Sequence, residues 1–256
     1  MKILVCVTEV PAAATGAVIA EGGRGLSFPE GTVFVMNPLD AHALEEALQI
    51  REAMGEGIIE VVAAGGERTE PVLFRALEMG ADRAFCLRGE GNLFSPLKIA
   101  GVIAEWARTR EYDLILTGVM SENGMSGAVG PLIGALLDLP AAVSVVHTDH
   151  QISGDSITVT SEHEGGLLQR VSLPLPALLT IQSGINRPRY PSLSNKLRAR
   201  EEKIEVQNFS FILSEGGDEF SFRREERAPE AEFLTGSSEE KAVALLKILR
   251  RESLLR

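Results

Sequence analysis

Residues 59–87 read IEVVAAGGERTEPVLFRALEMGADRAFCL and predict a strand, a helix and a second strand in succession. The apolar runs 59–63 and 83–87 have the length of buried strands. Between them, residues 70–79 place apolar side chains at helical spacing, and Gly80 follows as a helix stop. This order is typical of a parallel sheet with helices packed on its faces.

The same alternation continues on both sides of this stretch. Further strands are expected at residues 3–7, 32–36 and 114–117, and further helices at residues 40–54 and 96–109. One face of the first of these helices would carry Leu44, Ala47, Leu48 and Met54. The pattern predicts an open, mostly parallel, Rossmann-like α/β sheet.

After Pro140 the sequence changes to shorter β-rich pieces between Gly and Asp turns, at residues 142–148, 156–161, 168–173 and 178–182. These pieces could add antiparallel strands to the same sheet. We expect residues 1–205 to form the α/β domain and residues 206–256 to form a C-terminal arm and helix. Within that arm, the acid-rich residues 215–232 predict an extended or mobile connector, and residues 237–240 predict the cap of a final amphipathic helix.

Composition excludes several classes of function. The formal net charge of −11 and the pI near 5.0 argue against a nucleic-acid partner. No window reaches the roughly 18 apolar residues that span a bilayer, and the N-terminus predicts a first strand and not a signal peptide. Cys6 and Cys86 are expected as buried free thiols, as in a cytoplasmic protein or, in a eukaryote, a mitochondrial-matrix protein. The sequence has no metal-spaced His/Cys cluster, no phosphate-loop lysine motif and no nucleophile elbow.

The segment Met36-Asn37-Pro38-Leu39-Asp40 marks the end of a predicted strand and the start of a helix. Asn37 suits the N-cap, Pro38 suits the first helical position, and Asp40 can return a hydrogen bond from the third. One interpretation is a well-made helix start, which periodicity alone favours. The other is a nucleotide contact.

Residues 118–131, GVMSENGMSGAVGP, again follow a predicted strand and precede a helix. Small residues let backbone amides approach an anion closely, and a helix N-terminus adds favourable partial charge. Parallel α/β sheets bind ligands at such strand ends, so we expect a phosphate here, with a plain tight turn as the alternative. For a third such loop, residues 65–69, a nucleotide contact and an ordinary loop are equally good interpretations.

Four stretches together resemble the electron transfer flavoprotein beta subunit family. Residues 159–180, VTSEHEGGLLQRVSLPLPALLT, are similar to its signature segment, although Ser161 stands where the family usually has a basic residue. Residues 186–200, NRPRYPSLSNKLRAR, are similar to the loop with which the family recognises its dehydrogenase partners. MNPLD at residues 36–40 and ALEMGADR at residues 76–83 also match recurrent family phrases.

The resemblance implies an adenine nucleotide alpha-hydrolase-like fold and the role of an electron carrier subunit rather than of a catalyst by itself. Such a subunit pairs with an alpha subunit that holds the electron-carrying FAD, and the C-terminal arm and helix would dock on that partner. The heterodimer would carry electrons from acyl-CoA-type dehydrogenases of fatty acid beta-oxidation to a membrane quinone reductase or another acceptor.

Within this chain the resemblance implies a site for AMP or, in electron-bifurcating members, for a second FAD. The implied cofactor-binding residues are Cys6, Asn37, Pro38, Leu39, Asp40, Gly65, Thr69, Gly118, Asn123, Gly124, Met125, Ser126, Gly127, Ala128, Val129 and Gly130. Because residues 125–128 stand where the family has acids and amides, we expect backbone rather than side-chain contacts from them.

Residues 184–203 are implied as the segment that recognises partner dehydrogenases, with contacts from Tyr190, Leu193, Asn195, Lys196 and Arg198. Six basic and two acidic residues lie between positions 187 and 203 of this acidic chain, and they would steer an acidic partner. Leu193 suits an anchor that inserts into a pocket, although Ser194 replaces the proline usual in the family. Composition alone would make this segment a charged surface loop.

Two other functions stay open at this level. A stand-alone adenine-nucleotide-binding regulatory protein of the universal-stress type has a similar sheet, but it needs neither the Leu193 segment nor a terminal arm. An electron-bifurcating flavoprotein subunit would carry its own FAD. The sequence Val129-Gly130-Pro131 favours bifurcation, and the substituted residues 125–128 disfavour it.

Overall fold

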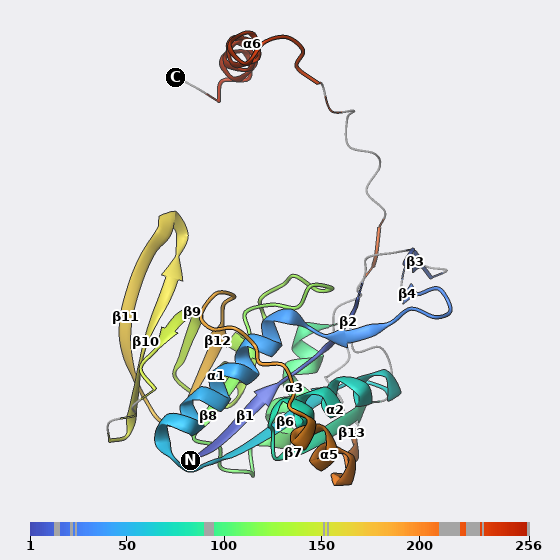
Figure 1. Ribbon diagram of the computed structural model, residues 1–256, viewed down its shortest axis with the longest axis vertical. Coiled ribbons are helices and arrows are strands. Elements are labelled where there is room, and N and C mark those ends of the chain that lie inside the picture. The colour runs from blue at the N-terminus through green and yellow to red at the C-terminus, as the bar shows by residue number, and fades with distance from the viewer. Residues whose placement is uncertain are drawn as a thin grey trace. The chain divides into compact units, whose positions relative to one another are not determined.

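Nine strands form one sheet in the part of the chain that the structure describes (Figure 1). Seven strands pair in parallel in the order β9-β12-β8-β1-β6-β7-β13, and β10 and β11 extend the sheet beyond β9 through antiparallel pairing. The strands are β1 (Lys2–Cys6), β6 (Ile58–Ala64), β7 (Arg83–Gly89), β8 (Leu114–Gly118), β9 (Ala141–Thr148), β10 (Ser156–His163), β11 (Leu167–Pro174), β12 (Ala177–Ile181) and β13 (Glu205–Phe209). The predicted open, mostly parallel α/β fold is confirmed.

This computed structural model describes residues 1–12, 16–20, 23, 25–89, 95–150, 152, 154–209, 221–223, 231 and 233–254. The chain divides into two units, Met1–Phe222 and Arg223–Arg256. The first unit continues past residue 205, because β13 pairs with β7 along its whole length.

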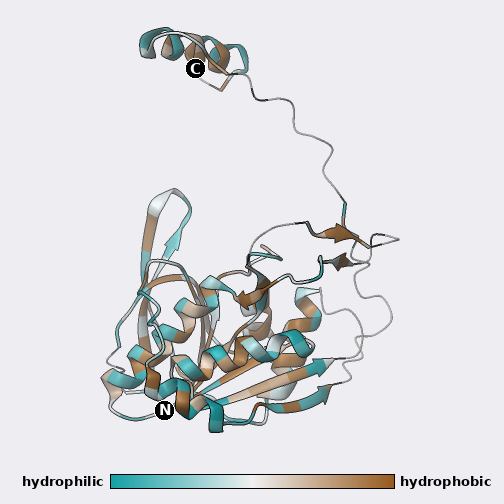
Figure 2. Cartoon of the chain, turned by 45° about the vertical axis from the view of Figure 1, so that its right-hand side comes forward, coloured by the Kyte–Doolittle hydropathy of each residue, from teal (hydrophilic) through white to brown (hydrophobic). Residues whose placement is uncertain are grey.

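Helices cover both faces of the sheet. On one face lie α1 (Pro38–Met54) and α2 (Glu70–Met79), with α5 (Leu193–Glu201) packed beside α2. On the other face lie α3 (Pro96–Ala107) and α4 (Val129–Leu136). The central strands are apolar at successive positions. Because successive residues of a strand point to opposite faces, both faces of these strands are apolar (Figure 2). No helix among the described residues is long and apolar enough to cross a membrane.

The strand–helix–strand unit of residues 59–87 folds as predicted. It forms β6, α2 and β7, and α2 covers Glu70–Met79. Gly80 ends the helix with φ 131°, a backbone conformation that favours glycine, and its amide donates to the carbonyl groups of Ala76 and Leu77.

Two details of the first half were predicted wrongly. The run 32–36 does contain a strand, β5 (Phe34–Met36), but this strand pairs antiparallel with β2 (Glu9–Pro11) outside the large sheet. It stays beside β2 because the amide of Asn37, one residue beyond it, donates to Thr8 O at 2.9 Å. At the end of α1, Met54 is 38% exposed, whereas Leu44, Ala47 and Leu48 are fully buried.

The second half contains elements that the sequence pattern did not predict. Of the four β-rich pieces, β10 and β11 form the expected antiparallel hairpin, whereas β9 and β12 join the parallel part of the sheet. The short pair β3 (Val18–Ile19) and β4 (Leu26–Ser27) and the edge strand β13 were missed. Residues 193–201, interpreted as loop, form α5, which begins after Ser192 as N-cap. The Ser192 hydroxyl accepts from the Asn195 amide at 3.1 Å.

The smaller unit contains the predicted terminal helix α6 (Ser238–Arg251). Its N-terminus is a capping box, in which the Ser237 hydroxyl accepts from the Glu240 amide and the Glu240 carboxylate accepts from the Ser237 amide. The connector predicted at residues 215–232 lies outside the described residues except at 221–223 and 231.

Tyr112→Phe should lower the free energy of unfolding by about 1.5–3 kcal/mol, because it removes a hydrogen bond to a buried charge. The Tyr112 hydroxyl donates to Glu60 Oε2 at 2.6 Å, and Glu60 is only 2% exposed. Urea unfolding of both proteins measures the difference. The control is Tyr190→Phe, since Tyr190 is the other tyrosine of the chain and is 86% exposed. Equal losses in the two variants would contradict a stabilising role for the Tyr112–Glu60 bond.

Candidate functional site

A cleft opens at the carboxyl ends of β1 and β8, where the order of strands changes direction. The chain leaves β1 for β6 and β7 on one side and then returns to β8 on the other side of β1. Ligands of parallel α/β sheets bind at such a switch point. The cleft has a volume of about 80 Å³, and its walls are Cys6, Val7, Thr8, Asp40, Ala64, Ile99, Ile103, Thr117, Gly118, Val119, Met120, Ser121, Ser126, Gly127, Ala128, Val129 and Gly130.

At two wall residues, Gly118 and Gly130, neighbouring atoms leave no room for a side chain. A Cβ atom on Gly118 would lie 2.5 Å from Asp40 Oδ1 and 2.8 Å from the carbonyl carbon of Leu39. A Cβ atom on Gly130 would lie 2.6 Å from both Thr117 Oγ1 and a Thr180 methyl group. Glycine at these positions therefore lets the start of α1 and the start of α4 approach the ends of the strands.

Asn37 and Asp40 fasten the loops around the cleft instead of capping α1 with their side chains. The expected cap bonds are absent at this helix start: Asn37 Nδ2 donates to Met120 O at 2.9 Å, and Asn37 Oδ1 accepts from the Glu122 amide at 3.3 Å. The Asp40 carboxylate accepts from the Thr8 amide at 2.8 Å and from the Gly118 amide at 3.1 Å. One helix start thus holds the segments that follow β1 and β8.

The Asp40 carboxyl group is 5% exposed, and it is the only acidic side chain among the residues that line the cleft. Burial raises the pKa of Asp40 to about 7, although hydrogen bonds from Asn37, Thr8 and Gly118 act in the opposite direction. A carboxyl group that is about half protonated near pH 7 repels a bound phosphate less than a full negative charge does.

The loop between β8 and α4 presents backbone groups to the cleft. Gly127 has φ 60°, and a Cβ atom there would meet nothing closer than Val119 O at 3.5 Å. The first amides of α4 have no acceptor inside their own helix, as at every helix start. Among the described residues that line the cleft there is no lysine or arginine, so these amides and the helix dipole are the positive groups that this wall offers to an anion.

Half of the predicted cofactor residues lie in the cleft wall, namely Cys6, Asp40, Gly118, Ser126, Gly127, Ala128, Val129 and Gly130. Asn37, Pro38 and Leu39, at the start of α1, do not line the cleft, and Asn123, Gly124 and Met125 lie in the adjoining loop. At the third loop, Ala64 lines the cleft, whereas Thr69 is 2% exposed and donates to Gly66 O at 2.6 Å. A Cβ atom on Gly65 would lie 2.4 Å from the Thr69 side chain, so these two residues pack on each other.

Sequence reasoning missed several wall residues. Thr8 and Thr117 stand at the ends of β1 and β8, and the position of a residue at a strand end is a signal that could have identified them. Ile99 and Ile103 come from α3 at i, i+4 spacing, which the sequence shows but which does not distinguish a cleft wall from the core.

The predicted recognition segment projects apolar side chains into solvent. Tyr190 is 86% exposed, Leu193 is 74% exposed, and Leu197, one turn beyond Leu193 on α5, is 53% exposed. Lys196 is half-buried. In contrast, the Arg198 guanidinium turns toward the body of the protein and donates to Leu77 O at 3.1 Å and to Ala81 O at 2.9 Å.

Comparison with known proteins agrees with these features. The model of the electron transfer flavoprotein domain matches residues 26–211. The electron transfer flavoprotein subunit beta of Bacillus subtilis is 34% identical over 232 residues, which are 88% of this chain and 89% of the relative. The corresponding subunit of Methylophilus methylotrophus is 30% identical over 97% of this chain and 98% of its own, and that of Bos taurus is 33% identical over 69% of each. The chain therefore belongs to the electron transfer flavoprotein beta subunit family.

Proposed function

We propose that this chain is the beta subunit of a heterodimeric electron transfer flavoprotein. The dimer would carry electrons from acyl-CoA-type dehydrogenases of fatty acid beta-oxidation to a quinone reductase or another acceptor. The observation that carries the proposal is the family match along the α/β unit, together with a glycine-walled cleft at its switch point. The same match disfavours a stand-alone regulatory nucleotide-binding protein, because the relatives are named as subunits.

The electron-carrying FAD would lie chiefly in the alpha subunit, with this chain forming one wall of its site. FAD supplies the electron transfer chemistry when it is bound, and the protein supplies orientation and electrostatics. This chain would act in the cytoplasm or, in a eukaryote, in the mitochondrial matrix.

The cleft in this chain would hold an adenine nucleotide, either AMP or the corresponding part of a second FAD. Its wall fits such a ligand, because small residues at 126–128 leave room for a phosphate near the first amides of α4. The apolar side chains of Ile99 and Ile103, which also line the cleft, suit the flat face of an adenine ring.

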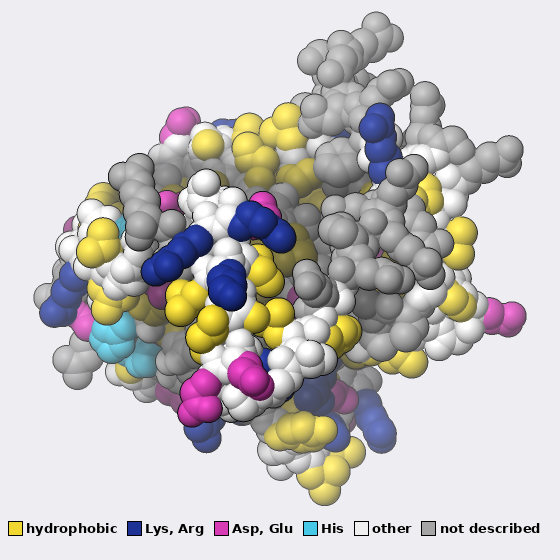
Figure 3. All heavy atoms as spheres, turned by 90° about the horizontal axis from the view of Figure 1, so that it is seen from above, with side chains coloured by type: hydrophobic (Ala, Val, Ile, Leu, Met, Phe, Trp, Pro, Cys, Tyr) yellow, Lys and Arg dark blue, Asp and Glu magenta, His cyan; other side chains and the backbone are white. Residues whose placement is uncertain are grey.

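The C-terminal unit would dock on the alpha subunit. Helix α6 exposes Val243, Leu245 and Leu246 by 46–53%, and none of its described residues is buried. Figure 3 shows hydrophobic side chains at the surface among basic and acidic ones. Since isolated helices of this length are marginally stable in water, an apolar side of this kind gains stability against a partner.

The test of this function is to co-express the chain with a candidate alpha subunit and to identify every released nucleotide by mass and molar ratio. One FAD and one AMP per heterodimer would establish a simple electron carrier, and two FAD would establish a bifurcating type. A chain that forms no complex and carries no flavin would refute the proposal, and a monomer that binds ATP would favour the regulatory protein.

Gly127→Leu should leave the heterodimer with substoichiometric nucleotide in this chain, because the new side chain would occupy the open space of the cleft. Gly154→Leu is the matched control, since Gly154 has φ 64° and a Cβ atom there would meet no other atom within 4 Å. Both variants carry the same left-handed backbone cost of about 1–2 kcal/mol. Full nucleotide content in Gly127→Leu, measured after acid release, would mean that the phosphate does not bind at this loop.

Leu193→Ala should reduce kcat/KM for electron delivery from an acyl-CoA dehydrogenase about tenfold, as expected when a buried anchor is lost from an interface. Flavin content and heterodimer stability should stay unchanged, because Leu193 is 74% exposed in this chain. Leu168→Ala is the control, since Leu168 is 66% exposed on β11, at the sheet edge opposite the one formed by β13. Stopped-flow reduction of the flavin measures the rates, and equal rates in Leu193→Ala and the unmodified protein would exclude the anchor.

A further inference from the structure

The local sequence of the segment that carries Tyr190 and Leu193 gives its backbone little stability. Residues 187–192 contain no helix or strand, and α5 is a nine-residue helix with mainly polar residues. A short polar helix is marginally stable without tertiary contacts. An exposed anchor side chain is useful for docking only if its backbone is already ordered, since ordering it on binding would cost affinity.

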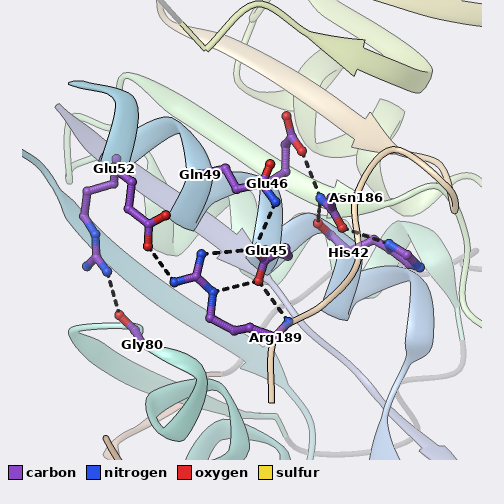
Figure 4. A network of polar contacts seen from close by, with 9 residues as sticks. His42, Glu45, Glu46, Gln49, Glu52, Gly80, Asn186 and Arg189 are labelled. Carbon is purple, nitrogen blue, oxygen red and sulfur yellow. Dashed lines mark hydrogen bonds and ion pairs between the residues drawn. The ribbon is translucent and has the colours of Figure 1, made fainter. Parts of the chain in front are cut away.

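Arg189 fixes this segment to α1 with a set of directed hydrogen bonds. Its Nε donates to Glu45 Oε2 at 2.9 Å and one terminal nitrogen donates to Glu45 Oε1 at 3.0 Å, while the backbone amide of Arg189 also donates to Glu45 Oε2 at 3.1 Å. The other terminal nitrogen pairs with Glu52 Oε1 at 2.5 Å. Figure 4 shows the guanidinium between the two carboxylates, which lie about two turns apart on α1.

Burial makes this contact strong. Glu45 is 4% exposed, and a carboxylate removed from water needs paired donors to compensate its lost hydration. The hydrogen bonds to Glu45 and then to Glu52 raise the pKa of Arg189, and the bond from Arg189 lowers the pKa of Glu52. The two-pronged contact with Glu45 requires the planar fork of arginine, which lysine lacks.

Two further contacts hold the ends of the same segment. Before Arg189, Asn186 Nδ2 donates to Glu46 Oε2 at 2.9 Å and to His42 O at 3.0 Å on α1 (Figure 4). After it, Arg198 donates to the last carbonyl groups of α2 and the next loop, and Ala199 is buried beside that helix. The apolar side chains of Tyr190 and Leu193 therefore project from a backbone that is tied on both sides.

We propose that Arg189, acting through the buried Glu45, is a positioning residue that preorganises the recognition segment for docking of the partner dehydrogenase. This inference rests on the proposed function. It assigns two of the six basic residues of the segment, Arg189 and Arg198, to internal anchoring rather than to contact with the partner. Loss of the fork would allow residues 186–192 to sample other conformations and would weaken docking without altering the flavin.

The experiment uses the complete heterodimer with its FAD and compares Arg189→Lys, Leu193→Ala and the double variant. The electron donor is an acyl-CoA dehydrogenase that reduces the unmodified complex when the dehydrogenase is supplied with butyryl-CoA. The rate of electron delivery gives kcat and the KM for the dehydrogenase. Arg189→Lys should raise this KM about fivefold, with kcat, flavin content and flavin spectrum unchanged. Amide exchange at residues 186–192 should become faster.

Arg88→Lys is the matched control, because Arg88 pairs with Glu70 at 2.9 Å and its side chain is 36% exposed, close to the 33% of Arg189. It should leave the KM unchanged. In the Leu193→Ala background, Arg189→Lys should have no further effect, because a segment without its anchor gains nothing from being ordered.

Each result has a distinct meaning. An unchanged KM in Arg189→Lys beside a raised KM in Leu193→Ala would overturn the inference and leave the docking proposal standing. Additive effects of the two substitutions on the KM of the double variant would also overturn the inference. No effect of Leu193→Ala would refute the docking proposal and the inference with it. If Arg189→Lys loses flavin, Glu52→Gln is used in its place, because it removes only the outer ion pair. This variant should raise the KM about twofold and should also speed amide exchange at residues 186–192.

Discussion

The arrangement of both candidate sites depends on buried carboxylates of one helix. Asp40, Glu45 and Glu46 of α1 are 5% exposed or less, and each needs hydrogen-bond donors because burial removes its hydration. The donors come from segments far apart in sequence: Thr8 and Gly118 for Asp40, Arg189 for Glu45, and Asn186 for Glu46. Helix α1 thereby fixes the cleft at its first turn and the recognition segment farther along.

In the proposed function, the cleft would accept an anion through backbone amides. Close packing at Gly118 and Gly130 brings the starts of α1 and α4 to the ends of the central strands. Since the amides of a helix start carry partial positive charge, the wall would attract a phosphate although none of its described residues is lysine or arginine. Asp40 is the acidic side chain among those residues, and its raised pKa reduces its negative charge.

The sequence predicted local elements well and long-range pairing poorly. Residues 59–87 fold as expected because strand length, helical spacing and Gly80 are local signals. The edge strand β13 and the small β2–β5 sheet depend on partners distant in sequence, so periodicity within them carried little information. Helix α5 was missed because its side chains are polar and only the Ser192 cap marks its start. For the cleft, strand ends and glycines were predictable, whereas Ile99 and Ile103 required the packing of α3 against the sheet.

The recognition segment shows why a count of charges overstates an electrostatic surface. Six basic residues between positions 187 and 203 suggested a strongly positive patch, yet sequence cannot separate arginines that face solvent from those that serve the fold. Arg189 pairs with carboxylates of α1, and Arg198 donates hydrogen bonds to carbonyl groups at the end of α2. The outward surface carries Tyr190, Leu193 and Leu197, together with the four remaining cations, Arg187, Lys196, Arg200 and Lys203. The positive charge that this segment would offer to a partner is therefore smaller than the count of six suggests.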